Sequence, residues 1–276
     1  METTHDFLGE EAAAEEESIF VIAAAVEEST SYITGTADAP AAILEASRQI
    51  ELYNFGAGVD LEGAGIATVD SSVKTLDELA AFVRLEREII ASGFHCFIGG
   101  EHSITPVILE EMKYGEIGIV WLDAHSDLRE EYLGNPRSHA CAAWNSLPFG
   151  NIVEIGVRSV SSGEAEFLRG SDRVKVFGDW NGEAARAIDL LPERVYISLD
   201  FDAIDPSLIR AVGTPEPGGL SWNDLTGIFD HIFKARKVVG MDAVELCPGE
   251  SDTASVFTAA TAVYEALTRA VASKGR

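Results

Sequence analysis

Two short runs of the sequence carry acidic side chains and a histidine at alternate positions. Asp123, His125 and Asp127 occur in the run VWLDAHSDLR, and Asp200 and Asp202 occur in SLDFDAIDP. Because successive side chains of a strand point to opposite faces, residues two positions apart converge on one side. Each run is therefore predicted to project its polar side chains together, in the way that metal ligands do.

His102, which follows paired glycines in GGEHS, adds a second imidazole to these four carboxylates. Four buried carboxylates in one place would repel one another and lose hydration unless cations neutralise them. One divalent ion supplies too little charge, whereas two ions about 3.5–4 Å apart form the usual two-metal arrangement for hydrolysis. Oxygen and imidazole donors without thiolate favour Mn²⁺ over a structural Zn²⁺, although affinity alone does not exclude Zn²⁺, Co²⁺ or Ni²⁺.

The alternative is that these residues are ordinary turn acids or helix caps, which is the usual role of a single D-x-H or D-x-D at the end of a strand. Two such runs together with His102 make this explanation weak, because each carboxylate would then need a partner of its own.

The elements that must position these residues form an alternating β and α pattern. Such alternation predicts a mostly parallel sheet with helices on both sides, and sites gather beyond the carboxyl ends of its strands. The strand-like runs are apolar almost continuously, as expected for strands covered on both faces. They span residues 18–26, 94–100, 117–125, 152–158, 174–178, 195–202 and 238–248, and amphipathic helical patterns include 75–92, 104–114, 221–237 and 251–273.

The length of 276 residues and the 46% hydrophobic composition predict one domain over residues 1–276, with an acidic N-terminal segment, 1–17, that could be mobile. The net charge of −26 argues against a nucleic-acid or membrane partner. At molar salt the Debye length falls to about 3 Å and screens this self-repulsion, so the composition favours a halophilic protein.

The three cysteines are too few and too scattered for a disulfide framework or a C-x-x-C metal site. The N-terminus is acidic where a signal peptide would be basic, and no apolar run approaches the length of a membrane span. These features predict a cytoplasmic protein with reduced thiols.

Four ordered blocks, GGEHS, DAHSD, SLDFDAIDP and DAVE, resemble the signature motifs of the ureohydrolases, the arginase and agmatinase family. The resemblance covers nearly the whole chain. It implies the three-layer α/β/α arginase-like fold with a mostly parallel central sheet, a homo-oligomer (trimer or hexamer) and two Mn²⁺ per chain. It also implies that one ion is held by His102, Asp123, Asp127 and Asp200, and the other by Asp123, His125, Asp200 and Asp202.

The same resemblance implies catalytic roles for three residues. Glu245 matches the glutamate that holds the substrate guanidinium, and His139 matches the histidine that shuttles protons to the leaving amine. Asp127 could also relay a proton. Two departures bear on the site: Glu101 stands where the family usually has Asp and could reposition His102, and the run AAW at 142–144 lacks the basic residues of many agmatinases.

These observations predict a manganese-dependent amidinohydrolase that releases urea from a small guanidine, with agmatine giving putrescine, a step of polyamine biosynthesis. Arginases have Asn shortly after the D-A-H-x-D block, whereas LREEY here resembles the agmatinase version and offers acids to an amine-bearing tail. Arg129 in this run could instead serve a carboxylate. The alternatives are an arginase, a guanidinobutyrase, a formimidoylglutamase, a non-catalytic metal-binding homologue or, more remotely, a zinc deacetylase on a related fold.

Overall fold

The computed structural model describes residues 6–9, 19–249 and 252–274. Most of the acidic segment 1–17 therefore lies outside the described residues. Within it, the 3-10 turn Phe7–Gly9 is described, and the side chains of Phe7 and Leu8 are buried.

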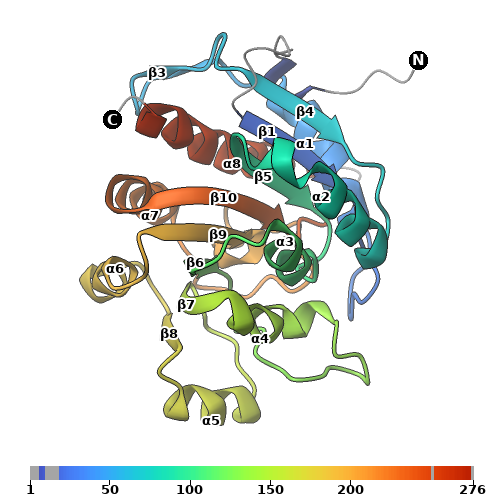
Figure 1. The fold of residues 1–276 in the computed structure, drawn as a ribbon, viewed down its shortest axis with the longest axis vertical. Coiled ribbons are helices and arrows are strands. Elements are labelled where there is room, and N and C mark those ends of the chain that lie inside the picture. The colour runs from blue at the N-terminus through green and yellow to red at the C-terminus, as the bar shows by residue number, and fades with distance from the viewer. Residues whose placement is uncertain (1–5, 10–18, 250–251, 275–276) are drawn as a thin grey trace.

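A single eight-stranded sheet forms the centre of the described structure (Figure 1), with every strand pairing parallel. Its order is β4-β1-β5-β10-β9-β6-β7-β8. All seven predicted strands are present, and the edge strand β4 is added to them. Two short strands, β2 Tyr53–Asn54 and β3 Val59–Asp60, form a separate antiparallel ribbon. The strands of the main sheet are β1 Ile19–Ala24, β4 Ile66–Asp70, β5 Phe94–Gly99, β6 Ile117–Leu122, β7 Gly150–Ile155, β8 Val174–Phe177, β9 Arg194–Asp200 and β10 Lys237–Val244.

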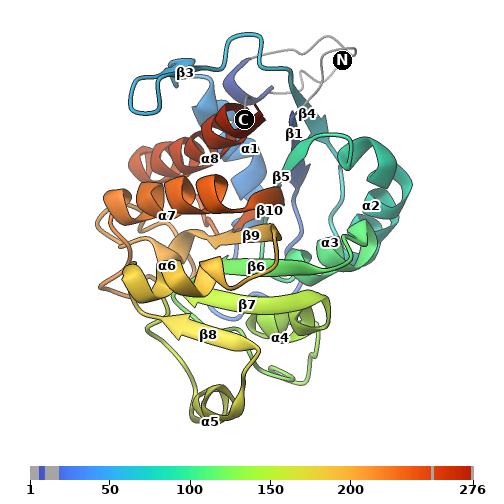
Figure 2. The same ribbon diagram turned by 60° about the vertical axis from the view of Figure 1, so that its left-hand side comes forward.

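Helices cover both faces of the sheet, so the chain has the predicted three α/β/α layers (Figure 2). The helices α1, α6, α7 and α8 pack on one face, and α2, α3, α4 and α5 on the other. No helix in the described ranges is both long and apolar enough to cross a membrane. The bounds are α1 Ala39–Ser47, α2 Leu76–Ile90, α3 Ile104–Met112, α4 Ala142–Ser146, α5 Ser162–Gly170, α6 Gly182–Asp189, α7 Trp222–Ala235 and α8 Thr253–Lys274.

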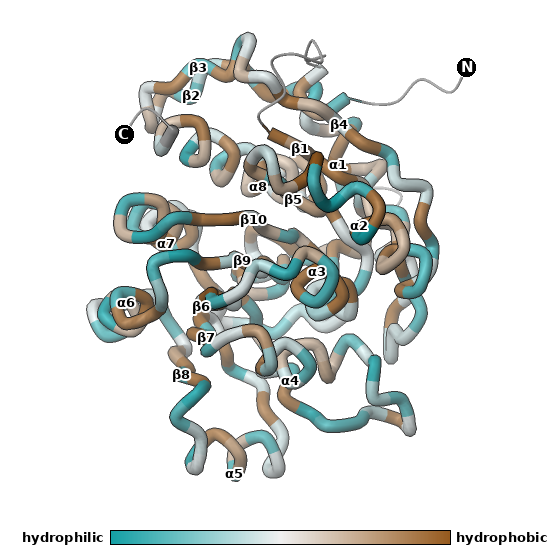
Figure 3. The backbone as a smooth tube through the Cα atoms, viewed as in Figure 1, coloured by the Kyte–Doolittle hydropathy of each residue, from teal (hydrophilic) through white to brown (hydrophobic). Residues whose placement is uncertain are grey.

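The two layers of core follow from the alternation of side chains along each strand. In β6, Val120 and Leu122 pack in the core under α7 and α8, while Ile119 and Trp121 pack under α2 and α3. Because both faces are covered, the middle strands are hydrophobic along most of their length (Figure 3).

Four neighbouring strands in the middle of the sheet, β5, β10, β9 and β6, end at the same edge and lead into the predicted site residues. The chain after β5 passes very close to the end of β1: a Cβ atom on Gly100 would lie 2.1 Å from the backbone oxygen of Val26. Only glycine fits there, and this close approach places Glu101 and His102 at the sheet edge.

The acidic composition has a consequence for stability that can be measured. With a net charge of −26, the thermal midpoint of unfolding should rise between dilute buffer and molar KCl, because salt screens the repulsion among carboxylates. Each kcal/mol of relief should raise the midpoint by roughly 2–4 °C for a chain of this size. Sucrose, which stabilises proteins without screening charge, is the control. Equal midpoints at low and high KCl would refute the halophilic interpretation.

Candidate active site

The six predicted metal-binding side chains meet at this edge of the sheet, although the strands do not bring them together by alternation. β6 ends at Leu122, so Asp123, His125 and Asp127 lie in the loop that follows. Asp127 has a left-handed backbone with φ of 48°, which redirects its side chain. Asp202 lies in a 3-10 turn after β9. The predicted convergence is present, and tight turns are its cause.

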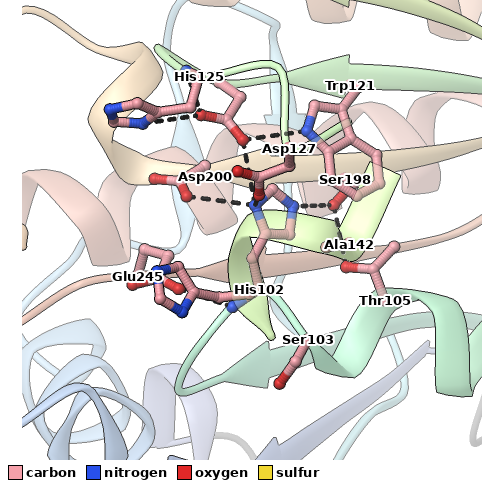
Figure 4. A network of polar contacts seen from close by, with 12 residues as sticks. His102, Ser103, Thr105, Trp121, His125, Asp127, Ala142, Ser198, Asp200 and Glu245 are labelled. Atoms are coloured by element: carbon pink, nitrogen blue, oxygen red, sulfur yellow. Dashed lines mark hydrogen bonds and ion pairs between the residues drawn. The ribbon is translucent and has the colours of Figure 1, made fainter. Parts of the chain in front are cut away.

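His102 is the centre of a first group of possible ligands (Figure 4). Its Nδ1 is 3.2 Å from Oδ2 of both Asp123 and Asp200, and 3.4 Å from Oδ2 of Asp127. His102, Asp123 and Asp127 offer ligand atoms within 4.8 Å of one another, as a metal ion requires. Asp200 contacts His102 but belongs to neither three-residue group in the described structure.

His125 is part of the second group, which shares Asp123 with the first. Its Nδ1 is 2.9 Å from Oδ2 of Asp202 and 3.5 Å from Oδ1 of Asp123. These three residues again offer atoms within 4.8 Å of one another. Asp123 is thus the carboxylate with one oxygen directed to each group.

The acids of this cluster disfavour one another's negative charge, whereas the imidazoles are stabilised in their positively charged form. Burial, followed by the charge of Asp123, raises the pKa of Asp127 well above its usual range. Burial and then the charge of Asp202 do the same to the pKa of Asp200. Burial lowers the pKa of His125, but Asp123 and Asp202 outweigh it and raise that pKa to about 12. Crowded carboxylates of this kind stay ionised when cations lie among them. Together with the imidazoles they are therefore a suitable donor set for divalent cations.

The far side of the His102 ring is fixed by a buried hydrogen-bond chain. Ser198 donates to Oδ1 of Asp242 at 2.7 Å, so its oxygen accepts from Nε2 of His102 at 2.8 Å. The indole of Trp121 stacks on the ring with a centroid distance of 4.2 Å. Burial lowers the pKa of His102, but Asp123 and Asp200 outweigh it and raise that pKa well above its usual range, so the carboxylates favour positive charge at this ring. Nδ1 is buried and has no hydrogen bond within the described residues. A cation among the three carboxylates would fit that nitrogen.

A cavity of about 260 Å³ opens onto these ligands and is lined by all three predicted catalytic residues, His139, Asp127 and Glu245. Glu245 follows β10 with φ of 67°, and its Oε1 accepts the backbone N–H of His102 at 2.7 Å. Burial raises the pKa of Glu245 to about 8. Burial also lowers the pKa of His139, which therefore favours the neutral imidazole at neutral pH.

The outer wall of the cavity corrects one expectation from the sequence. The acids Glu130 and Glu131 were expected to face an amine-bearing tail, but both are exposed and neither lines the cavity. The loop that carries them turns toward solvent, and Glu164, from α5, supplies the carboxylate instead. Glu164 Oε2 lies 3.9 Å from the guanidinium of Arg129, which sits 4.9 Å above the ring of Tyr132.

Two further positions differ from the sequence-based picture. Ala142 and Ala143 are buried in α4 rather than at the cavity rim, and the N–H of Trp144 donates to the carbonyl of Asp127. Glu101 contacts Ser29 rather than the His102 ring. Ser29 was not identified from the sequence, where it carries no motif of its own and merely precedes Thr30.

Comparisons with known proteins agree with this geometry. Residues 17–268 match the model of the Arginase family. The chain is 34% identical to an N(1)-aminopropylagmatine ureohydrolase of Thermus thermophilus, over 92% of this chain and 90% of that protein, and 34% identical to an agmatinase of Pyrococcus horikoshii, over 85% and 86%. The crystal structure of agmatine ureohydrolase of Thermoplasma volcanium superposes with a TM-score of 0.86 at 30% identity, covering 97% of this chain and 94% of that one. The chain therefore belongs to the arginase family and is a hydrolase that acts on amidino compounds.

Proposed function

We propose that the chain releases urea from a guanidine whose other end is an amine, with agmatine as substrate and putrescine as the second product. The observation that carries this proposal is the cavity lining. Among the described residues, five carboxylates line it, those of Asp127, Glu164, Asp200, Asp202 and Glu245. The one arginine in this described lining, Arg129, is already paired with Glu164 and stacked on Tyr132.

The inner half of the cavity holds the guanidinium. The Glu245 carboxylate is a charge-assisted and potentially bidentate partner for it, and a bound guanidinium favours the ionised form of Glu245. His102, Asp123 and Asp127 would hold one Mn²⁺, and Asp123, His125 and Asp202 the other, with Asp200 beside His102. Such ions, when bound, lower the pKa of water so that hydroxide is available near neutral pH.

Protons are handled by two side chains of the cavity. The neutral imidazole of His139 accepts a proton from the attacking water and returns it to the nitrogen of the departing amine, which is the usual role of histidine in general acid–base catalysis. Asp127, which also lines the cavity, can pass a proton as the tetrahedral intermediate collapses to urea and amine.

The outer half of the cavity distinguishes an amine tail from a carboxylate tail. An α-carboxylate, as in arginine, would need a free cation there. Arg129 would attract an α-carboxylate only weakly, because its guanidinium is already paired with Glu164 and one face of it is covered by the ring of Tyr132. A tail ammonium instead meets the Glu164 carboxylate. Burial raises the pKa of this carboxyl, but hydrogen bonds, first those from Ser161, and the charge of Arg129 together lower it below its usual value.

A second candidate substrate is agmatine extended by an aminopropyl group. The relative from Thermus thermophilus, which is 34% identical, is named for that compound. The exposed rim residues Tyr32 and Ile33 would contact the longer tail, because both line the outer part of the same cavity.

A guanidine panel tests the proposal. The Mn²⁺-loaded protein at several salt concentrations should release urea from agmatine or its aminopropyl derivative at least tenfold faster than from arginine or 4-guanidinobutyrate, judged by kcat/KM. N-formimidoylglutamate, which would release formamide instead of urea, completes the panel. Preference for a carboxylate-bearing guanidine would overturn the amine assignment. No turnover of any compound by metal-loaded protein would favour the non-catalytic alternative.

A further inference from the structure

Glu101 is a buried carboxylate that the proposed reaction does not use directly. It is fully buried after β5, and its carboxylate accepts four hydrogen bonds from the described residues. Its Oε2 accepts the backbone N–H groups of Glu28 and Ser29 at 3.1 and 2.7 Å. Its Oε1 accepts the hydroxyls of Ser29, at 3.0 Å, and Ser103. The Glu101 side chain thus ties the loop after β1 to the start of α3.

Ser29 connects this carboxylate to His139. Its Oγ lies 3.2 Å from His139 Nδ1 and accepts the backbone N–H of His139 at 2.9 Å. A serine hydroxyl has one proton and two lone pairs. Three partners, Glu101, His139 Nδ1 and His139 N–H, therefore use all of its hydrogen-bonding capacity.

The direction of each bond follows from the strength of the acceptors. The hydroxyl proton could go to Glu101 or to His139 Nδ1, and a carboxylate is the stronger acceptor because the bond is charge-assisted. Ser29 then donates to Glu101 and can only accept from His139. For the 3.2 Å contact between Ser29 Oγ and His139 Nδ1 to be a hydrogen bond, the ring has to carry a proton on Nδ1, and Nε2 is then the nitrogen left for the cavity.

From this geometry we propose that Glu101 and Ser29 are positioning residues that hold His139 in its Nδ1–H form. This inference rests on the role proposed above for His139. In that form Nε2 has a lone pair, takes a proton to give the imidazolium, and returns to the Nδ1–H form when it hands that proton to the leaving amine. The opposite tautomer presents an N–H to the cavity and cannot take the first proton.

Nitrogen NMR of His139 tests the tautomer separately from catalysis. The sample is the full-length chain labelled with ¹⁵N and loaded with a diamagnetic divalent ion in place of Mn²⁺. The unchanged protein should show neutral His139 protonated on Nδ1. Ser29→Ala should move the proton to Nε2, since Nδ1 loses its acceptor, and Ser29→Thr, which keeps a hydroxyl, should restore the Nδ1–H form.

The kinetics of the same variants should follow the tautomer. With Mn²⁺, kcat of Ser29→Ala should fall about tenfold, a part of the 10²–10⁴-fold that general acid–base catalysis contributes, while KM stays within about twofold because the guanidinium partners are intact. Glu101→Gln keeps the length of the side chain but removes its charge. It should weaken the acceptor that holds the Ser29 proton, so that the hydroxyl can donate to Nδ1, and so favour the same wrong tautomer.

Two control variants separate this proposal from a merely structural role. Ser103→Ala removes a hydroxyl from Glu101, and within the described residues Ser103 has no hydrogen bond to His139, so the tautomer should not change. Ser138 Oγ lies 3.4 Å from His139 Nδ1 and is a competing partner that can accept from Nδ1 or donate to it. A tautomer that changes in Ser138→Ala and not in Ser29→Ala would overturn the proposal, as would an unchanged tautomer in Ser29→Ala. Full kcat in His139→Ala would overturn its catalytic part, whatever the guanidine panel shows.

Discussion

Replacing Asp123 by Asn is expected to remove most of the hydrolase activity together with the bound metal. Asp123 is the residue common to both groups of possible ligands, with Oδ2 directed to His102 and Oδ1 to His125. Activity should fall by more than about 100-fold, because loss of a ligand costs more than the roughly 10–100-fold typical of outer-shell partners. Metal analysis after Mn²⁺ loading should give two ions per unchanged chain and fewer in the variant.

Three comparisons make this result interpretable. Asp200→Asn should also cost more activity than His102→Ala if Asp200 bridges the ions, and equal losses would show that the bridging assignment is wrong. Asp205→Asn removes a carboxylate from the run that also carries Asp200 and Asp202, but Asp205 belongs to neither ligand group. The metal content of this variant should therefore stay unchanged. A circular dichroism spectrum like that of the unchanged protein shows that Asp123→Asn still folds.

Replacing Glu245 by Gln should weaken substrate capture and leave the metals in place. Gln keeps the shape and can still accept the His102 N–H, but it lacks the charge that pairs with a guanidinium. The lost charge-assisted contact is worth about 1.5–3 kcal/mol, so kcat/KM for the best substrate should fall at least tenfold. Steady-state kinetics and metal analysis on one preparation measure both effects.

The control for this variant is Glu164→Gln, at the outer wall of the cavity. It should reduce kcat/KM for amine-tailed guanidines while leaving that for a simple alkylguanidine nearly unchanged, since Glu164 is proposed to meet the tail. Glu245→Gln should reduce both. Unchanged kinetics in Glu245→Gln would remove Glu245 from the guanidinium site.

Much of the fold could be predicted because most strands and several helices have long, regular patterns of apolar residues. The seven apolar runs became the strands of the parallel sheet. β4 was not predicted, because its sequence IATVD is short and half polar, as suits an edge strand. Helices α1, α5 and α6 were not singled out either, since eight or nine residues make too few turns to establish a helical period.

The predicted metal ligands of the site could be read from the sequence, whereas the residues that surround and orient the site could not. The six predicted metal ligands lie in three compact motifs at the carboxyl ends of β5, β6 and β9, and Glu245 lies in a fourth motif at the end of β10. Glu164 and Ser29 depend on which loops meet across the cavity, and nothing local in the sequence encodes that. Glu101 was expected to act on its neighbour His102. The extra methylene instead directs its carboxylate to a loop about 70 residues earlier, because β1 pairs with β5.

The position of β10 has a consequence for how the site is assembled during folding. β10 is the last strand along the chain, yet it lies between β5 and β9 in the middle of the sheet. Without it, β4-β1-β5 and β9-β6-β7-β8 share no strand pairing. The first group carries His102 and the second carries Asp123, His125, Asp127, Asp200 and Asp202. The ligands therefore come from two parts of the sheet that only β10 joins, and we expect the set to be complete only after β10 has been synthesised. The same strand also delivers Glu245.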